Sequence, residues 1–175
     1  MPIYYLNAGS VIQDGLTPNT GYHNFDLLFS NIILIDEDII ELVDNGVIDD
    51  EASSLPSFHI SMTIRSYLGN TNKPTWKTGN VLWFWFYGTN SYIRIYDINL
   101  DPGGVFIGWM DVVSEIPRSD ISRCNIINGG ITLLSFRFGG SGGPGGAQHI
   151  YITNNIFVNS GIDSADAYSC YGSLF

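Results

Sequence analysis

Basic residues are scarce in this sequence. Seven Lys and Arg stand against 17 Asp and Glu, which gives a formal net charge of −10. A protein that binds nucleic acid or an anionic membrane surface usually neutralises phosphates with clustered Lys and Arg. The sequence therefore predicts no direct contact with nucleic acid and none with a membrane.

Long apolar runs are also missing. The longest ones, at residues 32–35 and 81–87, are far shorter than the ~20 residues with which a helix crosses a bilayer. Residues 1–15 lack the basic segment and the uninterrupted apolar run of a secretory signal. We therefore expect a protein that is made and folded in a cytoplasm without a signal peptide or a transmembrane segment.

Cysteine and histidine are few and widely scattered. Cys124 and Cys170 fit no metal or redox spacing, and two reduced thiols are a simpler interpretation than a disulfide. His23, His59 and His149 do not form the two-histidine motif of a zinc site. Because neither cysteine lies in a recognisable nucleophile context, we predict no enzymatic activity and no cofactor.

Apolar and aromatic residues are abundant, at 45% and 14% of the 175 residues. A chain of this length and composition can bury a core without disulfides or metals. The sequence predicts one domain over residues 1–175, in which the ends, residues 1–15 and 167–175, are candidates for extended arms.

Short strands and tight turns dominate the rest of the chain. Residues 81–98, 123–138 and 149–158 each place aromatic or β-branched runs on both sides of a turn, as hairpins do. The three turns are Gly88-Thr89-Asn90, Asn128-Gly129-Gly130 and Thr153-Asn154-Asn155. The predicted fold class is all-β, a mostly antiparallel sandwich, jelly roll or small barrel.

One segment departs from this pattern. Between residues 36 and 46, Ile39, Ile40, Leu42 and Val43 recur at helical spacing. Acidic residues precede them and Asn45-Gly46 follows, as expected at the two ends of a helix. We predict one short helix near residues 37–45.

A second fold stays open. The segments HIYITNNIFVNSG and ISRCNIINGG resemble the Asn-rich rungs of parallel β-helices, which are found in polysaccharide-processing proteins. The resemblance covers two short segments without a fixed period. A β-helix is the minor alternative, and it would require that the apparent hairpins belong to successive coils.

Carboxylates are concentrated between residues 36 and 51. Such a group can hold calcium, but its spacing does not fit an EF-hand loop, and a solvated acidic face explains it more simply. The group consists of Asp36, Glu37, Asp38, Glu41, Asp44, Asp49, Asp50 and Glu51.

The candidate binding residues are aromatic or terminal. Trp76 lies in a polar loop, residues 69–79, where a Trp has little reason to be unless it covers something. Tyr92 and Tyr96 could join it in a platform that stacks on sugar rings, although core packing is the simpler explanation for most aromatic residues. Leu174 and Phe175 give the chain an apolar end, which is easier to explain if it docks against a partner.

The short strands, the Gly- and Asn-rich turns and the scarcity of lysine resemble bacteriophage virion proteins in general style. This resemblance implies a capsid decoration (cement) protein or a tail subunit in the virion, with itself and other virion proteins as partners and a trimer as the expected homo-oligomer. Alternatively, the segments SFHISMTIRSYL and SYIRIYDI resemble the concanavalin-type, lectin-like jelly roll. That resemblance implies a carbohydrate-binding module that attaches to a glycan on a host surface.

Overall fold

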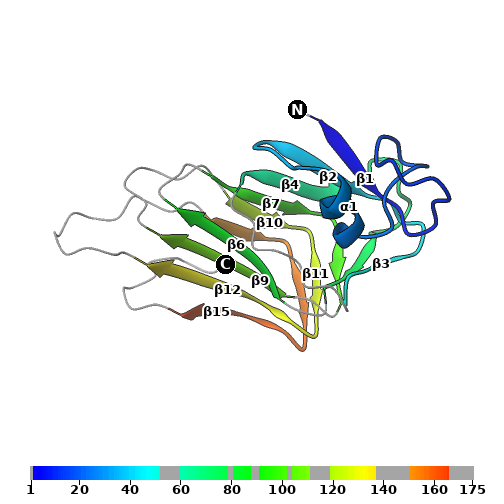
Figure 1. Ribbon diagram of the computed structural model, residues 1–175. Helices are drawn as coiled ribbons and strands as arrows, with labels where there is room; N and C mark the ends of the chain where they lie inside the picture. The colour runs from blue at the N-terminus through cyan, green and yellow to red at the C-terminus, as the bar shows by residue number, and fades with distance from the viewer. Residues whose placement is uncertain are drawn as a thin grey trace.

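The chain winds into a solenoid of parallel β-strands (Figure 1). The computed structural model describes residues 2–51, 60–78, 81–87, 91–101, 104–110, 119–136 and 150–165. Within these residues, fifteen strands form three sheets in which the paired strands all run parallel. Because each coil from β4 onward adds one strand to each sheet, the architecture is a parallel β-helix.

Each sheet is a stack of strands from successive coils. Sheet A has the order β1 (Ile3–Leu6), β2 (Asp38–Leu42), β4 (Met62–Ser66), β7 (Ile93–Tyr96), β10 (Ser119–Ser122) and β13 (Ile150–Thr153). Sheet B has the order β3 (Val47–Asp49), β5 (Thr75–Lys77), β8 (Asn99–Leu100), β11 (Asn125–Ile127) and β14 (Ile156–Val158). Sheet C has the order β6 (Val81–Tyr87), β9 (Gly104–Met110), β12 (Gly130–Phe136) and β15 (Gly161–Ala165), which lie side by side as one layer in Figure 1.

The core is a set of apolar ladders inside the solenoid. In sheet A the strands pair so that one isoleucine stacks on the next from coil to coil. This ladder consists of Ile40, Ile64, Ile95, Ile121 and Ile152, and the first four are fully buried. The ladder of sheet B runs through Ile48, Trp76, Leu100 and Ile126, which are also fully buried. Both ladders follow from the period of two, which sends alternate side chains of a strand to the same face.

The corners between sheets A and B bend at single residues of positive φ. Asp97, Arg123 and Asn154 have φ of 58°, 55° and 56° and occupy the same position in three successive coils. Asn155 fixes one such corner, because its side chain accepts from the N–H of Cys124 and donates to the carbonyl of Ile121, both at 2.8 Å. These bonds supply partners for backbone groups that leave the sheet at the corner.

A helix covers the N-terminal end of the solenoid. Helix α1 (Phe25–Asn31) begins at Asn24, whose side chain accepts from the N–H of Leu27. It buries Phe25 and Leu28, and the ring of Phe25 stacks on Trp76 with centroids 4.0 Å apart. Solenoids need such caps because the last coil has no neighbour to cover its core.

The predicted antiparallel fold is wrong, because the strands of each expected hairpin belong to different sheets. Strands β13 and β14 are successive sides of one coil, and so are β11 and β12. A two-residue hairpin of the commonest primed type needs positive φ at both central residues. Here Asn154 and Asn128 have positive φ while Asn155 and Gly129 do not, so the chain bends without reversing. The turn at residues 88–90 lies outside the described residues. The β-helix alternative matches the architecture: β6 and β7 belong to successive coils, whereas β11 and β12, and β13 and β14, are sides of one coil.

The helix predicted near residues 37–45 is also wrong. Residues 38–42 form strand β2, and Gly46, at φ 109°, lies in a bend between β2 and β3. Ile40 and Leu42 point into the core while Glu41, on the opposite face, is nearly buried as well. A strand covered on both faces lacks clean alternation, so its apolar residues imitate helical spacing. No helix in the described residues is long and apolar enough to cross a membrane.

Candidate functional site

The outer face of sheet A carries two rows of polar and aromatic side chains. One row runs from Tyr5 through Glu41, Arg65, Tyr96 and Ser122 to Thr153. The second runs from Thr63 through Arg94 and Asp120 to Tyr151. Strands in a sheet are ~4.8 Å apart, so each row forms a ladder of closely spaced groups. We call this face, together with Tyr67 and the Asp97 and Arg123 corner, the sheet A surface.

Glu41 and Arg65 form a fixed ion pair in the first row. The Nε and Nη2 atoms of Arg65 donate to Oε1 of Glu41 at 2.9 and 2.6 Å. The Glu41 side chain is only 6% exposed, whereas the Arg65 side chain is 40% exposed. The carboxylate therefore holds the guanidinium in place and leaves part of it facing outward.

Aromatic rings flank these charges. The ring of Tyr5 meets the ring of Tyr67 edge to face, with centroids 5.9 Å apart. Burial raises the pKa of Tyr5, and the nearby Glu41 carboxylate raises it further. The Tyr5 phenol is therefore neutral at physiological pH and can both donate and accept a hydrogen bond.

Tyr92 and Arg94 form a second aromatic and cationic pair near the other end of the strands. The guanidinium of Arg94 lies 4.1 Å from the centre of the Tyr92 ring, within the range of a cation–π contact. The Tyr92 hydroxyl donates to Oε2 of Glu37 at 2.8 Å. Burial, followed by this hydrogen bond, raises the pKa of Tyr92 to about 12, so the phenol stays protonated.

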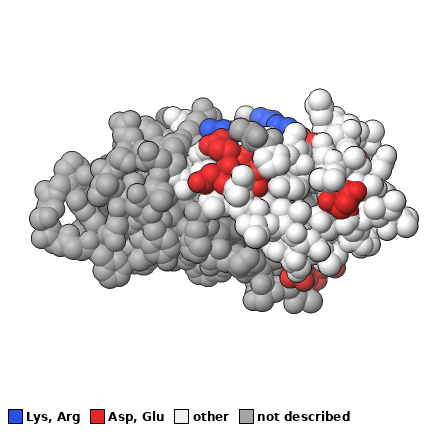
Figure 2. Space-filling view, turned by 45° about the horizontal axis from the view of Figure 1, so that its top comes forward, with Lys and Arg blue, Asp and Glu red and all other residues white. Residues whose placement is uncertain are grey.

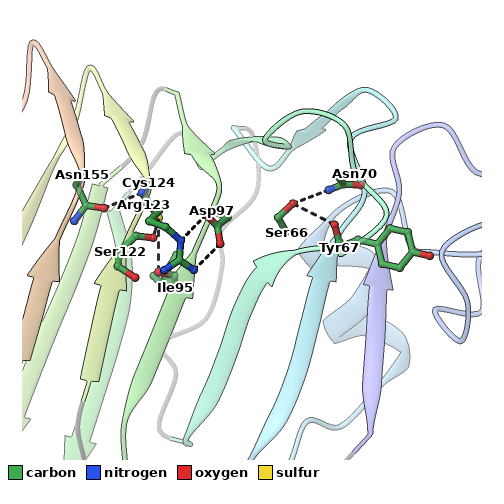
Figure 3. A network of polar contacts seen from close by, with 9 residues as sticks. All are labelled: Ser66, Tyr67, Asn70, Ile95, Asp97, Ser122, Arg123, Cys124 and Asn155. Carbon is green, nitrogen blue, oxygen red and sulfur yellow. Dashed lines mark hydrogen bonds and ion pairs between the residues drawn. The ribbon is translucent and has the colours of Figure 1, made fainter.

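Asp97 and Arg123 join neighbouring corners at the end of β7 and β10 (Figure 3). The Nε and Nη2 atoms of Arg123 donate to Oδ1 and Oδ2 of Asp97 at 2.8 and 2.7 Å. This bidentate bond raises the pKa of Arg123. Asp97 and Arg123 both have positive φ. Non-glycine residues rarely adopt this conformation, and those that do cluster at functional sites. The guanidinium also lies 5.6 Å from the centre of the Tyr96 ring.

The sheet A surface thus alternates planar cations, carboxylates and phenols. Figure 2 shows acidic side chains gathered in separate patches, one of them close to Lys or Arg. On this surface, Arg65 and Arg123 each already have a carboxylate partner. The sheet A surface is suited to a neutral, hydroxyl-rich ligand, which can stack on the aromatic rings while its hydroxyls bond to the charged side chains.

The residues predicted from the sequence lie in different parts of the molecule. Tyr96 lies on the sheet A surface and is partly exposed, and Tyr92 is nearly buried beneath Arg94. Trp76 is fully buried in the ladder of sheet B, so it has no surface to offer a ligand. Leu174 and Phe175 lie outside the described residues.

Several carboxylates of the acidic group at residues 36–51 accept hydrogen bonds from backbone N–H groups in different parts of the fold. Asp36 accepts from the N–H of Ser61, and Asp44 accepts from the N–H groups of Thr71 and Asn72. Asp50 accepts from the N–H groups that begin helix α1. In the described part of the chain, no three His, Cys, Asp or Glu side chains come together as a metal site.

Cys124 is a buried free thiol whose pKa rises to about 11 because of burial. Cys170, its expected reduced counterpart, lies outside the described residues, as does the Gly tract at residues 139–146.

Sequence reasoning missed Arg65, Asp97 and Arg123, and it named Glu41 only as a member of the acidic group. The signal for Asp97 and Arg123 was the alignment of ISRCNIINGG with HIYITNNIFVNSG, which the structure places in register. Applying the same alignment one coil earlier would have set Asp97 beside Arg123. Comparison with protein-family models, with curated proteins and with solved structures finds no match to this chain.

Proposed function

We propose that this chain is a binding module, without catalysis of its own, that holds a glycan along the sheet A surface. The observation that carries the proposal is the alternation of tyrosines with fixed guanidinium groups on a parallel β-helix face. Sugar rings present C–H faces that stack on aromatic rings and hydroxyls that bond to charged side chains.

Preorganisation favours this use. Glu41 fixes Arg65, Asp97 fixes Arg123, and Tyr92 supports Arg94 before any ligand arrives. A ligand therefore orders few side chains of the protein when it binds. The loss of side-chain entropy on binding is a cost that usually weakens surface contacts. The successive strands repeat these groups at short intervals, so an extended chain of sugars could meet several of them at once.

Glycan-array screening followed by calorimetry tests the proposal. We expect wild type to bind a neutral polysaccharide or oligosaccharide, and Tyr96→Ala and Arg94→Ala each to weaken that binding about tenfold, or about 1.4 kcal/mol. Lys77→Ala, which removes a cation from the outer face of sheet B, is the matched control and should bind as wild type does. Failure to bind any glycan, or binding that both sheet A variants leave unchanged, would refute the proposal.

A second proposed role is that of a structural subunit in a virus particle, in contact with itself and other particle proteins. Side-chain bonds that tie each coil to the next favour it, because they stiffen the solenoid. Asn125 donates to Oδ1 of Asn99 at 2.8 Å, and Asn159 donates to Oδ1 of Asn128 at 3.2 Å. Detection of the chain in purified particles would support this role, and its absence from them would refute it.

A further inference from the structure

The core of the solenoid is less covered at its C-terminal end than in its middle coils. Ile121 and Ile126 are fully buried, like their counterparts in earlier coils. Ile152 and Phe157 occupy the same inward positions in the last described coil and are only partly buried. At the other end Tyr4, which pairs with Ile40, is also only partly buried, and helix α1 buries Phe25 and Leu28 there.

The backbone of β14 has an unpaired edge in the described structure. The Ile156 N–H donates to the Cys124 carbonyl, and the Val158 carbonyl accepts from the Asn128 N–H, both at 2.9 Å. Neighbouring residues of a strand direct their backbone groups to opposite sides, so the N–H and C=O of Phe157 face away from β11. Among the described strands none pairs with this edge, because β14 ends the order of sheet B.

Strands β13 and β14 of this coil contain no charged residue, whereas β15 contains Asp163. Residues 150–161 contain no Asp, Glu, Lys or Arg in a chain of net charge −10. Ile156 and Val158 are 59% and 44% exposed on the outer face of β14. Exposed strand edges are usually protected by Lys, Pro or a bulge, and the described β14 edge has none of these.

We propose that this end binds a second copy of the chain through β14. Around a two-fold axis at Phe157, the two β14 strands pair antiparallel, and each Phe157 exchanges both backbone bonds with Phe157 of the second copy. Ile156 then lies beside Val158 of the second copy, so the apolar pair forms twice. The uncharged segment around β14 favours a copy of itself because two such edges meet without the repulsion that acidic side chains on them would cause.

This pairing gives the assembly role a contact surface and rests on that role for its use in a particle. Light scattering behind size exclusion, over roughly 1–200 µM protein, measures it directly. We expect a wild-type dimer, and in Ile156→Lys/Val158→Lys a dissociation constant raised about 100-fold, because like charges meet twice across the axis. Val11→Lys/Leu68→Lys is the matched control, since both side chains are 94% exposed elsewhere.

A mixing experiment guards against misfolding of the lysine variant. Ile156→Glu/Val158→Glu should also be monomeric, and an equimolar mixture of the Glu and Lys variants should form a heterodimer. A monomeric wild type, or a dimer that the Lys substitutions leave intact, would overturn the pairing. A chain that is found in particles yet stays monomeric overturns the pairing alone, whereas absence from particles overturns the assembly role.

Discussion

Replacing Trp76 by Phe tests how the N-terminal cap is anchored. The buried indole of Trp76 stacks on Phe25, and its Nε1 donates to Oδ2 of Asp50 at 2.8 Å. Asp50 also accepts from the N–H groups of Phe25 and Asp26, both at 3.2 Å. One carboxylate therefore joins the first turn of helix α1 to strand β5.

The expected loss follows from these contacts. Phe keeps an aromatic ring against Phe25 but removes the N–H donor, and a hydrogen bond to a charged group contributes about 1.5–3 kcal/mol. The smaller ring also leaves some core volume unfilled, which adds about 1 kcal/mol. We expect Trp76→Phe to lower the free energy of unfolding by about 2–4 kcal/mol at pH 7.

The loss should shrink in acid. Burial raises the pKa of Asp50 above its ordinary 3.8, while the N–H of Phe25 and the indole of Trp76 act in the opposite direction. The folded state therefore binds a proton more readily than the unfolded state, and the charge on Asp50 destabilises the fold at neutral pH. Removing the indole donor raises the pKa of Asp50 further, so protonation relieves the variant more than wild type. The two stabilities should converge as the pH falls through the folded pKa.

Urea unfolding followed by far-ultraviolet circular dichroism at pH 7 and pH 4 measures both stabilities. Asp50→Asn, alone and combined with Trp76→Phe, is the control, because without the carboxylate the effect of Trp76→Phe should not change with pH. If Trp76→Phe lowered the free energy of unfolding by the same amount at pH 7 and pH 4 in the chain that keeps Asp50, the reasoning would be refuted. It would also be refuted by a deficit below about 0.5 kcal/mol, the usual range of a surface substitution.

Three further predictions concern the corners between sheets A and B. Asn155→Ala should lower the free energy of unfolding by about 1–3 kcal/mol, because two backbone groups lose their partner; a urea midpoint equal to that of wild type would contradict this. Arg123→Ala should cost less than about 1 kcal/mol in the same assay, because its ion pair with Asp97 is largely exposed, and a cost above about 2 kcal/mol would show a structural role for the corner. In a Cys170→Ser background, the Cys124 thiol should react with iodoacetamide at pH 8 about 100-fold more slowly in the folded than in the urea-unfolded chain. The thiol is buried in the folded chain, and its pKa there is about 11. Equal rates in the two states would contradict this prediction.

The sequence located many of the strands but not their pairing. The runs at residues 81–87, 93–96, 125–127 and 150–153 are strands, as their aromatic and β-branched residues indicate. A period of two shows that a segment is extended and which side is apolar, but it does not name the neighbouring strand. The turn residues could not settle this either, since Asn accepts positive φ both in a hairpin and at a solenoid corner.

The site was partly predictable for a related reason. Tyr92 and Tyr96 stood out because their strand alternates, whereas the ionic partners of the sheet A surface are distant in sequence. Contacts between successive coils join residues 24, 26 and 31 positions apart, so no constant period marks them. Trp76 was wrongly predicted to lie in a loop and bind a ligand, because its strand, β5, is only three residues long and lies among polar residues.

The coils stay in register despite their unequal lengths because the corners, and not the coil lengths, fix the alignment. In the ten-residue units 95–104, 121–130 and 152–161, the described residues align position by position, with positive φ at the third residue and Gly at the last. At Gly130 the approach is close, since a Cβ there would lie 3.0 Å from the carbonyl oxygen of Gly161. The corner between sheets A and B and the corner between sheets B and C lie within this ten-residue unit, whereas the variable lengths fall between sheet C and the next strand of sheet A. Internal repeats of such a solenoid are therefore to be sought as short corner units at irregular intervals, because only the corners impose a residue type on the sequence.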